Sequence, residues 1–179
     1  MELEYTEIQA HRGGMGLWPE NTIMAMKNAI DLGVDMLELD LMISKDSLVV
    51  VSHEEIMSSE YVTKPDGTRV TKAEEASLVL FGMPYDDIRR YDTGLAGDSR
   101  YPARVRIAAC KPLLSELLDA TEAHIREKGG RNLRYNIEIK ASKGKEQRCM
   151  APDYKTFTDL CMAVILEKGL GGRVTIQSF

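Results

Sequence analysis

The sequence predicts an α/β fold built from parallel strand–helix–strand units. Short apolar segments with a period of two alternate along the chain with segments whose apolar residues recur every three or four positions. Such alternation is typical of a parallel sheet, because each helix returns the chain to the same end of the sheet. The length of 179 residues suits one core-bearing domain and is short for two. We therefore expect a single domain over residues 1–179.

The N-terminal part is expected to form a strand, a helix and two more strands. Asn21 or Thr22 caps the start of the helix, and Gly33 ends it. In the next strand polar and apolar residues alternate, which places two carboxylates on one face. That face carries Glu38, Asp40 and Met42, and the opposite face carries Leu37, Leu39, Leu41 and Ile43. The four elements cover residues 7–14, 21–33, 35–44 and, after a KDS turn, 48–53.

The regular pattern is interrupted between residues 54 and 111. This segment is polar and punctuated by glycine and proline, with KPDGT as a clear turn. A long interruption inside a domain is typical of a functional insertion or lid. After it, Pro112 suits the first turn of a helix that ends at Gly129 and Gly130. The remaining expected elements are this helix at 111–130, a strand at 133–140, a helix at 154–172 and a strand at 173–179.

Composition and charge exclude several classes of protein. The formal net charge of -5 provides no basic surface, so we expect no nucleic-acid partner. No window approaches the roughly 18 apolar residues of a membrane span, and the N-terminus lacks the basic start and apolar centre of a signal peptide. We expect a cytoplasmic protein without a transmembrane segment. If an N-terminal leader is missing from the sequence, the expected location is instead periplasmic or secreted. Three widely spaced cysteines, Cys110, Cys149 and Cys161, form no metal-binding pattern and are assigned no function.

Ionisable residues gather at the carboxyl ends of four predicted strands. In a parallel barrel these ends open on one face, where active sites are built, so we expect the groups to converge there. A single histidine is more often structural, as we expect for His124 on the exposed side of its helix. The seven groups at the strand ends are His11, Arg12, Glu38, Asp40, His53, Glu138 and Lys140.

The chemistry of this set favours cleavage of a phosphodiester. Three carboxylates without a thiolate make an oxygen-rich site that suits Mg²⁺ or Ca²⁺ better than structural zinc. One divalent cation would also relieve their mutual repulsion. Arg12 and Lys140 are donors typical of a phosphate site. His11 and His53 can divide the proton transfers, one accepting a proton from the attacking hydroxyl and the other giving one to the leaving alkoxide.

Sequence motifs extend over nearly the whole chain in a specific order. HRGG and PENT come first, followed by GVDMLELD, VVVSH, IEIK and TIQSF. In this combination the sequence resembles the glycerophosphodiester phosphodiesterase family, and the stretch from YDTGLAGDSRYP to KPLLSEL resembles its bacterial members. The resemblance implies a TIM (β/α)8 barrel of the phospholipase C-like phosphodiesterase type, with residues 54–111 as a small insertion after the third strand.

The resemblance also implies a role for each residue of the site. Glu38, Asp40 and Glu138 would bind one divalent cation, His11 and His53 would be the general acid and base, and Arg12 and Lys140 would bind the phosphate. Glu20 and Asn21 match the PENT motif and would support the site at its entrance, although Asn21 could act only as a helix cap. The substrate would be a small-molecule glycerophosphodiester. Its hydrolysis would yield glycerol 3-phosphate and an alcohol, through a cyclic phosphate formed by the neighbouring glycerol hydroxyl.

The sequence departs from the family pattern in three places. Glu54 follows His53 where the family commonly has aspartate, and Ser47 occupies a turn position where the family commonly has glycine. The chain also ends after the fifth expected strand, whereas an eight-stranded barrel takes about 250 residues. We therefore expect a barrel truncated after its fifth strand.

Two alternatives to a glycerophosphodiesterase stay open. A truncated barrel could be a non-catalytic module that binds metal and phosphate, or an inert fragment, but a pure binder has no need of both histidines. A phospholipase D-type lyase that acts on lysolipids or sphingolipids would use the same residues, and the insertion would distinguish it. The leaving alcohol and the oligomeric state do not follow from the sequence.

Overall fold

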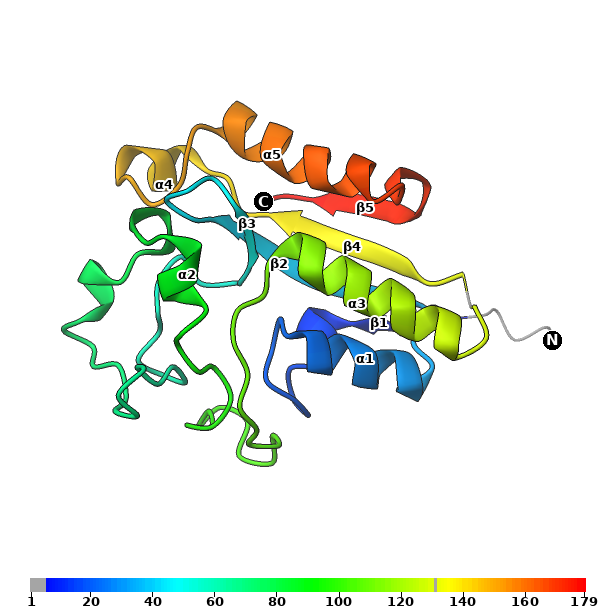
Figure 1. Ribbon diagram of the computed structural model, residues 1–179, viewed down its shortest axis with the longest axis horizontal. Helices are drawn as coiled ribbons and strands as arrows, with labels where there is room; N and C mark the ends of the chain where they lie inside the picture. Colours follow the sequence, from blue (N-terminus) through cyan, green and yellow to red (C-terminus); the bar gives the residue numbers. More distant parts are fainter. Residues whose placement is uncertain (1–5, 131) are drawn as a thin grey trace.

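The computed structural model describes residues 6–130 and 132–179 and contains a single five-stranded sheet (Figure 1). Four of its strands run parallel in the order β1-β2-β4-β5. Their bounds are Gln9–Ala10 for β1, Met36–Ile43 for β2, Arg134–Ile139 for β4 and Val174–Gln177 for β5. Within the described residues the sheet is open, because β1 pairs only with β2 and β5 only with β4. The predicted α/β class with parallel strands is confirmed.

The segment predicted as the third barrel strand is instead the second arm of a hairpin. This strand, β3 (Val49–Val51), pairs antiparallel with the carboxyl end of β2, where Val50 lies opposite Met42. The intervening turn is closed by a hydrogen bond of 3.0 Å from Ser44 N to Leu48 O. So short a connection permits only an antiparallel pair, since a parallel pair needs a crossover of a dozen or more residues. All five expected strands are therefore present in one sheet, but only four of them are parallel.

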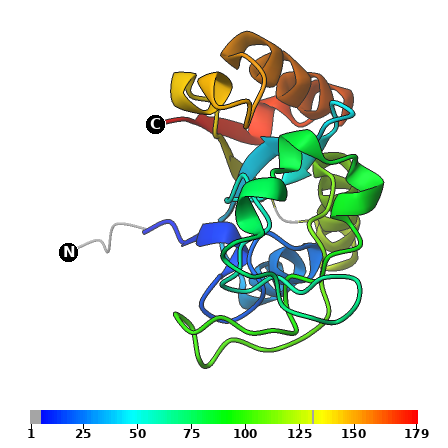
Figure 2. The same cartoon turned by 90° about the vertical axis from the view of Figure 1, so that its left-hand side faces the viewer.

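Three long helices lie on the same side of the sheet (Figure 2). They are α1 (Ile23–Leu32), α3 (Leu114–Glu127) and α5 (Tyr154–Glu167). Pro112 precedes α3 rather than entering its first turn, because its carbonyl accepts a hydrogen bond of 2.9 Å from Val51 N. The shorter elements are α2 (Tyr85–Ile88), α4 (Lys143–Gln147) and 3₁₀ turns at His11–Gly13, Glu75–Ser77, Leu80–Gly82 and Gly171–Arg173. None of the helices in the described residues is long and apolar enough to cross a membrane.

The two faces of the sheet differ in chemistry. The face toward the helices is apolar, and on it Leu37, Leu39 and Ile137 are completely buried in the main core with Leu117 and Phe157. Strand pleating sends the intervening residues to the opposite face. That face carries Glu38, Asp40, Asn136, Glu138, Thr175 and Gln177. The alternation predicted for residues 35–44 thus separates the core from a polar surface.

Residues 54–111 add no strand to the main sheet. They form the lobe beside the carboxyl ends of the strands, drawn from cyan-green to yellow-green in Figure 1. The lobe packs around a second apolar cluster that also includes two strand residues. Its members are Met42, Val50, Met57, Tyr61, Val62, Val70, Leu80, Tyr85 and Ile88. The insertion is therefore anchored to β2 and β3 next to the polar residues at the strand ends.

Candidate active site

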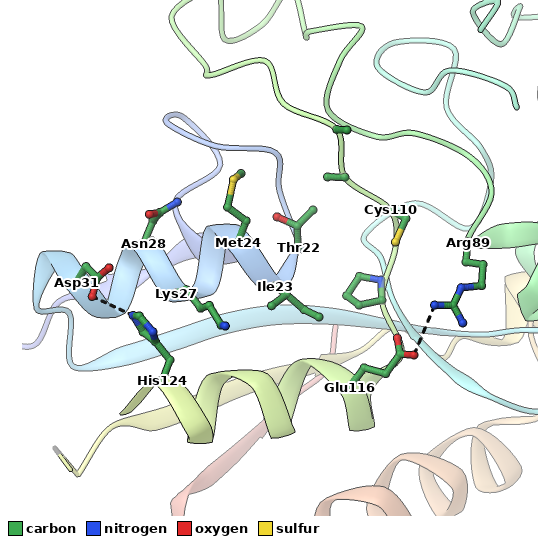
Figure 3. Close-up of a pocket in the computed structure, with 13 residues that line it drawn as sticks. Thr22, Ile23, Met24, Lys27, Asn28, Asp31, Arg89, Cys110, Glu116 and His124 are labelled. Carbon is green, nitrogen blue, oxygen red and sulfur yellow. Dashed lines mark hydrogen bonds and ion pairs between the residues drawn. The ribbon is translucent and has the colours of Figure 1, made fainter. Parts of the chain in front are cut away.

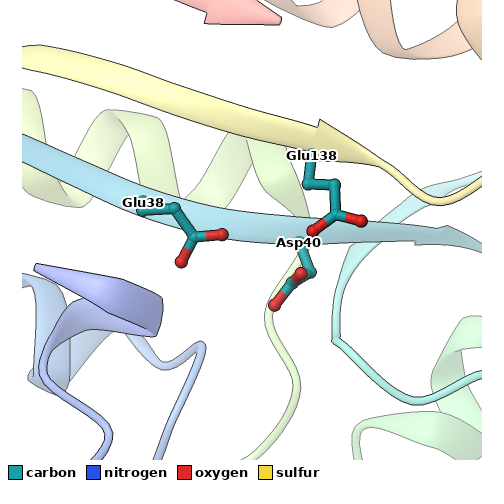
Figure 4. A group of neighbouring side chains, drawn as sticks. All are labelled: Glu38, Asp40 and Glu138. Carbon is teal, nitrogen blue, oxygen red and sulfur yellow. The ribbon is translucent and has the colours of Figure 1, made fainter. Parts of the chain in front are cut away.

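Three buried carboxylates meet between the middle of β2 and the carboxyl end of β4 (Figure 4). Glu38 and Asp40 lie two residues apart on β2 and therefore share a face. Glu138 on β4 is the register partner of Asp40. One carboxylate oxygen of each residue lies within 4.8 Å of the other two. The structure thus brings together the three acids that the sequence analysis selected as metal ligands.

Burial and mutual repulsion shift the ionisation of this acidic cluster. Burial, followed by the charge of Asp40, raises the pKa of Glu38 to about 7. Burial also pushes the pKa of Asp40 upward, but the hydrogen bond from Asn21 and the charge of Lys140 outweigh it, so that this pKa is lowered. Near neutral pH Glu38 is therefore only partly ionised, and a bound cation would favour its charged form.

A tight turn after β1 brings the backbone of the HRGG motif against β2. Arg12 N donates a hydrogen bond of 2.6 Å to Glu38 Oε2. Arg12 adopts a left-handed conformation with φ of 51°, and Gly13 follows with φ of 76°. A Cβ atom on Gly13 would lie 2.9 Å from the Cβ atom of Ala25 in α1, so the turn requires glycine here. The turn aims both the amide and the guanidinium of Arg12 at the acidic cluster.

Asn21 contacts the acidic cluster rather than capping α1. Its Nδ2 donates to Asp40 Oδ2 at 2.9 Å, and Asp40 N donates to its Oδ1 at 3.2 Å. Thr22 is the cap, because its hydroxyl accepts a hydrogen bond of 3.2 Å from Ala25 N. The alternative that Asn21 serves only as a helix cap is therefore wrong, and its amide fixes both the side chain and the backbone of Asp40.

Arg12 and Glu20 belong to a buried chain of charges. Arg12 Nη1 lies 3.0 Å from Glu20 Oε1, and Arg12 Nε lies 3.3 Å from Asp40 Oδ2. The second oxygen of Glu20 lies 3.2 Å from Nη2 of Arg104, which comes from the insertion. The Glu20 side chain is only 3% exposed. The expected position of Glu20 at the site entrance is therefore corrected, because this carboxylate lies in the interior between two arginines.

His11 borders the acidic cluster and faces solvent. Its Nε2 lies 4.0 Å from Glu38 Oε2, and 58% of its side chain is exposed. Partial burial and then the charge of Arg12 lower the pKa of His11. The imidazole is thus open to a ligand on one side and close to the carboxylates on the other.

His53 reaches the same region from β3, despite the antiparallel direction of that strand. Ser52 N donates a hydrogen bond of 2.9 Å to Asp40 O, which ties the end of β3 to the middle of β2, next to the acidic cluster. His53 Nδ1 lies 2.8 Å from Glu54 Oε1, and this hydrogen bond is the main reason that the pKa of Glu54 falls to about 2. Glu54 thus holds the imidazole through its Nδ1 atom.

Lys140 is a counter-charge to two members of the acidic cluster. Its Nζ lies 2.7 Å from Glu138 Oε1 and 3.1 Å from Asp40 Oδ1. Burial opposes its charge, but the hydrogen bond to Glu138 and the charge of Asp40 raise the pKa of Lys140 overall. The amine is therefore cationic at neutral pH and lies beside Glu138 and Asp40.

Several polar residues near the acidic cluster were missed by the sequence analysis. Gln177 Nε2 lies 3.5 Å from Glu138 Oε2, and Gln177 Oε1 accepts a hydrogen bond of 2.8 Å from Asn136. Strand alternation could have found both amides, because they share the face of Glu138. Arg104 and Lys111 lie in the aperiodic insertion, where no local pattern marks a residue that contacts Glu20 or Ser52.

A groove of about 750 Å³ lies apart from the acidic cluster, between α1, α3 and residues 108–112 (Figure 3). His124 lines it and is 2.9 Å from Asp31, with only 13% of its side chain exposed. The expectation that His124 faces solvent is wrong, because it joins α1 to α3, but its structural role agrees with the prediction. The groove contains none of the groups proposed for phosphodiester chemistry.

Comparisons with known proteins identify the family of the chain. The model of the glycerophosphoryl diester phosphodiesterase family matches residues 11–179. A glycerophosphodiester phosphodiesterase of Caldanaerobacter subterraneus is 32% identical over 136 residues, which are 76% of this chain and 46% of that protein. The chain thus spans about half the length of this curated relative.

Solved structures show the same fold. A protein of Silicibacter pomeroyi DSS-3, described as a candidate glycerophosphoryl diester phosphodiesterase, superposes with a TM-score of 0.83 at 24% identity. The match covers 97% of this chain and 58% of that protein. An Oleispira antarctica phosphodiesterase in complex with the product sn-glycerol-3-phosphate superposes with a TM-score of 0.57 at 19% identity. This match covers 97% of this chain and 65% of that protein. The four parallel strands therefore form part of a TIM barrel that the described residues do not close.

Proposed function

The chain belongs to the glycerophosphoryl diester phosphodiesterase family, and from that premise we propose that it hydrolyses glycerophosphodiesters to glycerol 3-phosphate and an alcohol. One observation carries the proposal. Three buried carboxylates lie within 4.8 Å of one another, His11, Arg12 and Lys140 border them, and His53 is close enough for its charge to lower the pKa of Asp40. This combination provides for a metal, a phosphate and two proton transfers at one edge of the sheet.

We assign Glu38, Asp40 and Glu138 to one divalent cation, Mg²⁺ or Ca²⁺. Their oxygens converge, and burial, followed by the charge of Asp40, raises the pKa of Glu38 to about 7. An all-oxygen donor set fits a hard cation. When bound, such a cation supplies Lewis-acid stabilisation of a phosphate oxygen and lowers the pKa of a nearby hydroxyl.

Arg12 and Lys140 are assigned to the substrate phosphate. Their side chains are 11% and 13% exposed, and each lies beside Asp40. A guanidinium and an ammonium on two sides of the acidic cluster can hold two phosphate oxygens by charge-assisted hydrogen bonds. The phosphate would then lie between the two histidines.

His11 and His53 are assigned to the proton transfers. One imidazole accepts the proton of the glycerol hydroxyl as its oxygen bonds to phosphorus, and the other donates a proton to the departing alkoxide. Water then opens the cyclic phosphate with the roles reversed, so that both imidazoles regain their starting states. Glu54 holds the His53 ring in one orientation for both steps.

Release of glycerol 3-phosphate from glycerophosphocholine tests the proposal. With Mg²⁺ or Ca²⁺ present we expect turnover that a chelator abolishes and that Glu38→Ala removes. His11→Ala is expected to lose activity by roughly 10²- to 10⁴-fold, the usual contribution of a general acid or base. His124→Ala is the matched control, because this histidine pairs with Asp31 away from the acidic cluster and its loss should leave activity intact.

The same assay separates the alternatives. Binding of metal and glycerol 3-phosphate by folded protein without turnover would favour the non-catalytic module. Turnover of lysophosphatidylcholine to a cyclic product, with glycerophosphocholine left intact, would favour the lyase. Unchanged activity in Glu38→Ala or His11→Ala would contradict the proposed mechanism.

A further inference from the structure

Two buried cationic residues of the insertion contact the neighbours of the proposed active-site residues. Arg104 and Lys111 are only 6% and 5% exposed, and neither has a role in the reaction proposed above. We infer that both are positioning residues, with Arg104 holding the Arg12 guanidinium and Lys111 holding the turn that carries the His53 imidazole. The inference rests on the proposed function, because it assigns a kinetic consequence to each support.

Arg104 supports Arg12 through a shared carboxylate. Its Nε donates to Met15 O at 2.7 Å, and its terminal nitrogens lie 3.2 Å from Glu20 Oε2 and 3.4 Å from Asp98 Oδ2. The other oxygen of Glu20 lies 3.0 Å from Arg12 Nη1. Since Glu20 is buried between the two arginines, removal of Arg104 would leave it free to turn and to change the direction of Arg12.

Lys111 supports His53 through the hydroxyl of the residue before it. Lys111 Nζ lies 2.8 Å from Ser52 Oγ and 5.5 Å from the centre of the Tyr61 ring. Ser52 Oγ in turn donates a hydrogen bond of 2.7 Å to Glu54 O, so this bond spans His53. In the part of the chain that the structure describes, no carboxylate forms an ion pair with Lys111. The direct contacts of its buried ammonium are therefore the hydroxyl and the ring. Burial lowers the pKa of Lys111 to about 8, and the more distant charges of Glu20, Glu54 and Asp40 oppose that shift.

The two supports should affect different kinetic constants. Arg12 is assigned to the phosphate, which is present in the bound substrate, so misplacement of its guanidinium weakens substrate binding and raises KM. His53 transfers a proton in the transition state, so misplacement of its ring lowers kcat. A general loss of structure would instead lower the fraction of active protein in both cases.

Methionine substitutions test this separation with glycerophosphocholine as substrate. We expect Arg104→Met to raise KM roughly tenfold with little change in kcat, and Lys111→Met to lower kcat roughly tenfold with little change in KM. Ser52→Ala should lower kcat as Lys111→Met does, and the double variant should lose no more than either single one. Arg90→Met and Lys64→Met are the matched controls, since both side chains lie in the insertion and pair locally with Asp87 and Glu74.

Hydrogen–deuterium exchange provides a readout that does not need activity. Arg104→Met should raise exchange in residues 12–21 and not in 50–55, whereas Lys111→Met should do the reverse. Should Arg104→Met not fold, Glu20→Gln tests the same link from its other end. Loosening of both segments by either variant, or equal changes in kcat and KM, would overturn the inference. A wild-type protein without turnover would refute the proposed function, and the exchange pattern would then decide the positioning inference alone.

Discussion

The two faces of β2 are equally buried and have opposite effects on stability. All eight residues of the strand are buried. On the helix side, Leu37, Leu39 and Leu41 are 0% exposed and pack in the main core, while on the other side Glu38 and Asp40 are 2% and 1% exposed. Burial of a leucine side chain contributes about 1.5–3 kcal/mol to folding. Burial of a carboxylate opposes folding unless counter-charges or hydrogen bonds compensate.

The comparison shows how one strand can serve the fold and the site together. The carboxylates are held by groups from three other places in the chain: Arg12 from the turn after β1, Asn21 from the segment before α1, and Lys140 from the residue after β4. These contacts only partly offset the effects of burial and of the charge of Asp40, because the pKa of Glu38 still rises to about 7. The apolar core on the helix side must therefore offset the free-energy cost of burying these carboxylates.

The largest effect on stability is expected on the apolar face. Leu39→Ala removes a completely buried side chain between the sheet and the helices, and should lower the free energy of unfolding by about 2–5 kcal/mol. Urea denaturation measures this directly. Leu166→Ala, at a position that is 63% exposed, is the control and should change stability little. A small effect of Leu39→Ala would show that the helix side is not the main source of stability.

On the polar face a substitution should stabilise the metal-free protein. The pKa of Glu38 rises from 4.5 to about 7 on folding, so between these pH values the native state retains a proton that the unfolded state has lost. Stability from this group is therefore present at low pH and falls as the pH rises toward 7. With a chelator at pH 8, Glu38→Gln should be more stable than wild type by on the order of 2 kcal/mol, and the gain should vanish near pH 4.

Urea midpoints at the two pH values, in the presence of chelator, check this prediction. The exposed Glu167→Gln serves as control for the loss of one negative charge. A Glu38→Gln protein that is less stable than wild type at pH 8 would mean that the hydrogen bonds of Glu38 outweigh its repulsion, and the contrast between the two faces of β2 would fail.

The smallest effect is expected in the β2–β3 turn, which belongs to neither face. Ser47 has a left-handed backbone with φ of 61°, the conformation that costs a residue with a Cβ atom about 1–2 kcal/mol. Ser47→Gly should raise stability by only about 0.5–1 kcal/mol, because glycine also loses more entropy on folding. A thermal unfolding scan measures the shift, and a lower midpoint would show that the serine side chain is needed in the turn.

Most of the fold could be predicted because it depends on local patterns. The alternation in residues 35–44 predicts which side chains of β2 meet the helices, and Gly33 ends α1 with a left-handed φ of 84°. Strand direction does not follow from such patterns. The direction of β3 depends on the length of the turn before it, and the count of parallel strands was wrong for that reason.

The site could be predicted where its residues lie at strand ends, and not where they come from irregular segments. Glu38, Asp40 and Glu138 converge because parallel register places them side by side. Arg104 and Lys111 contact this region only through the folded insertion, so no spacing in the sequence relates them to Glu20 or Ser52. The interior position of Glu20 likewise depends on Arg104, which explains why it was expected at the entrance.

The most direct test of the central claim is a calorimetric titration of the chelator-treated protein with Mg²⁺ and with Ca²⁺. If the polar face of β2 and β4 is a cation site, one of the two ions should bind at a single saturable site, and Glu138→Gln should remove or strongly weaken that binding while the protein remains folded. Absence of saturable binding in the wild type, or equal affinity in the variant, would contradict the account.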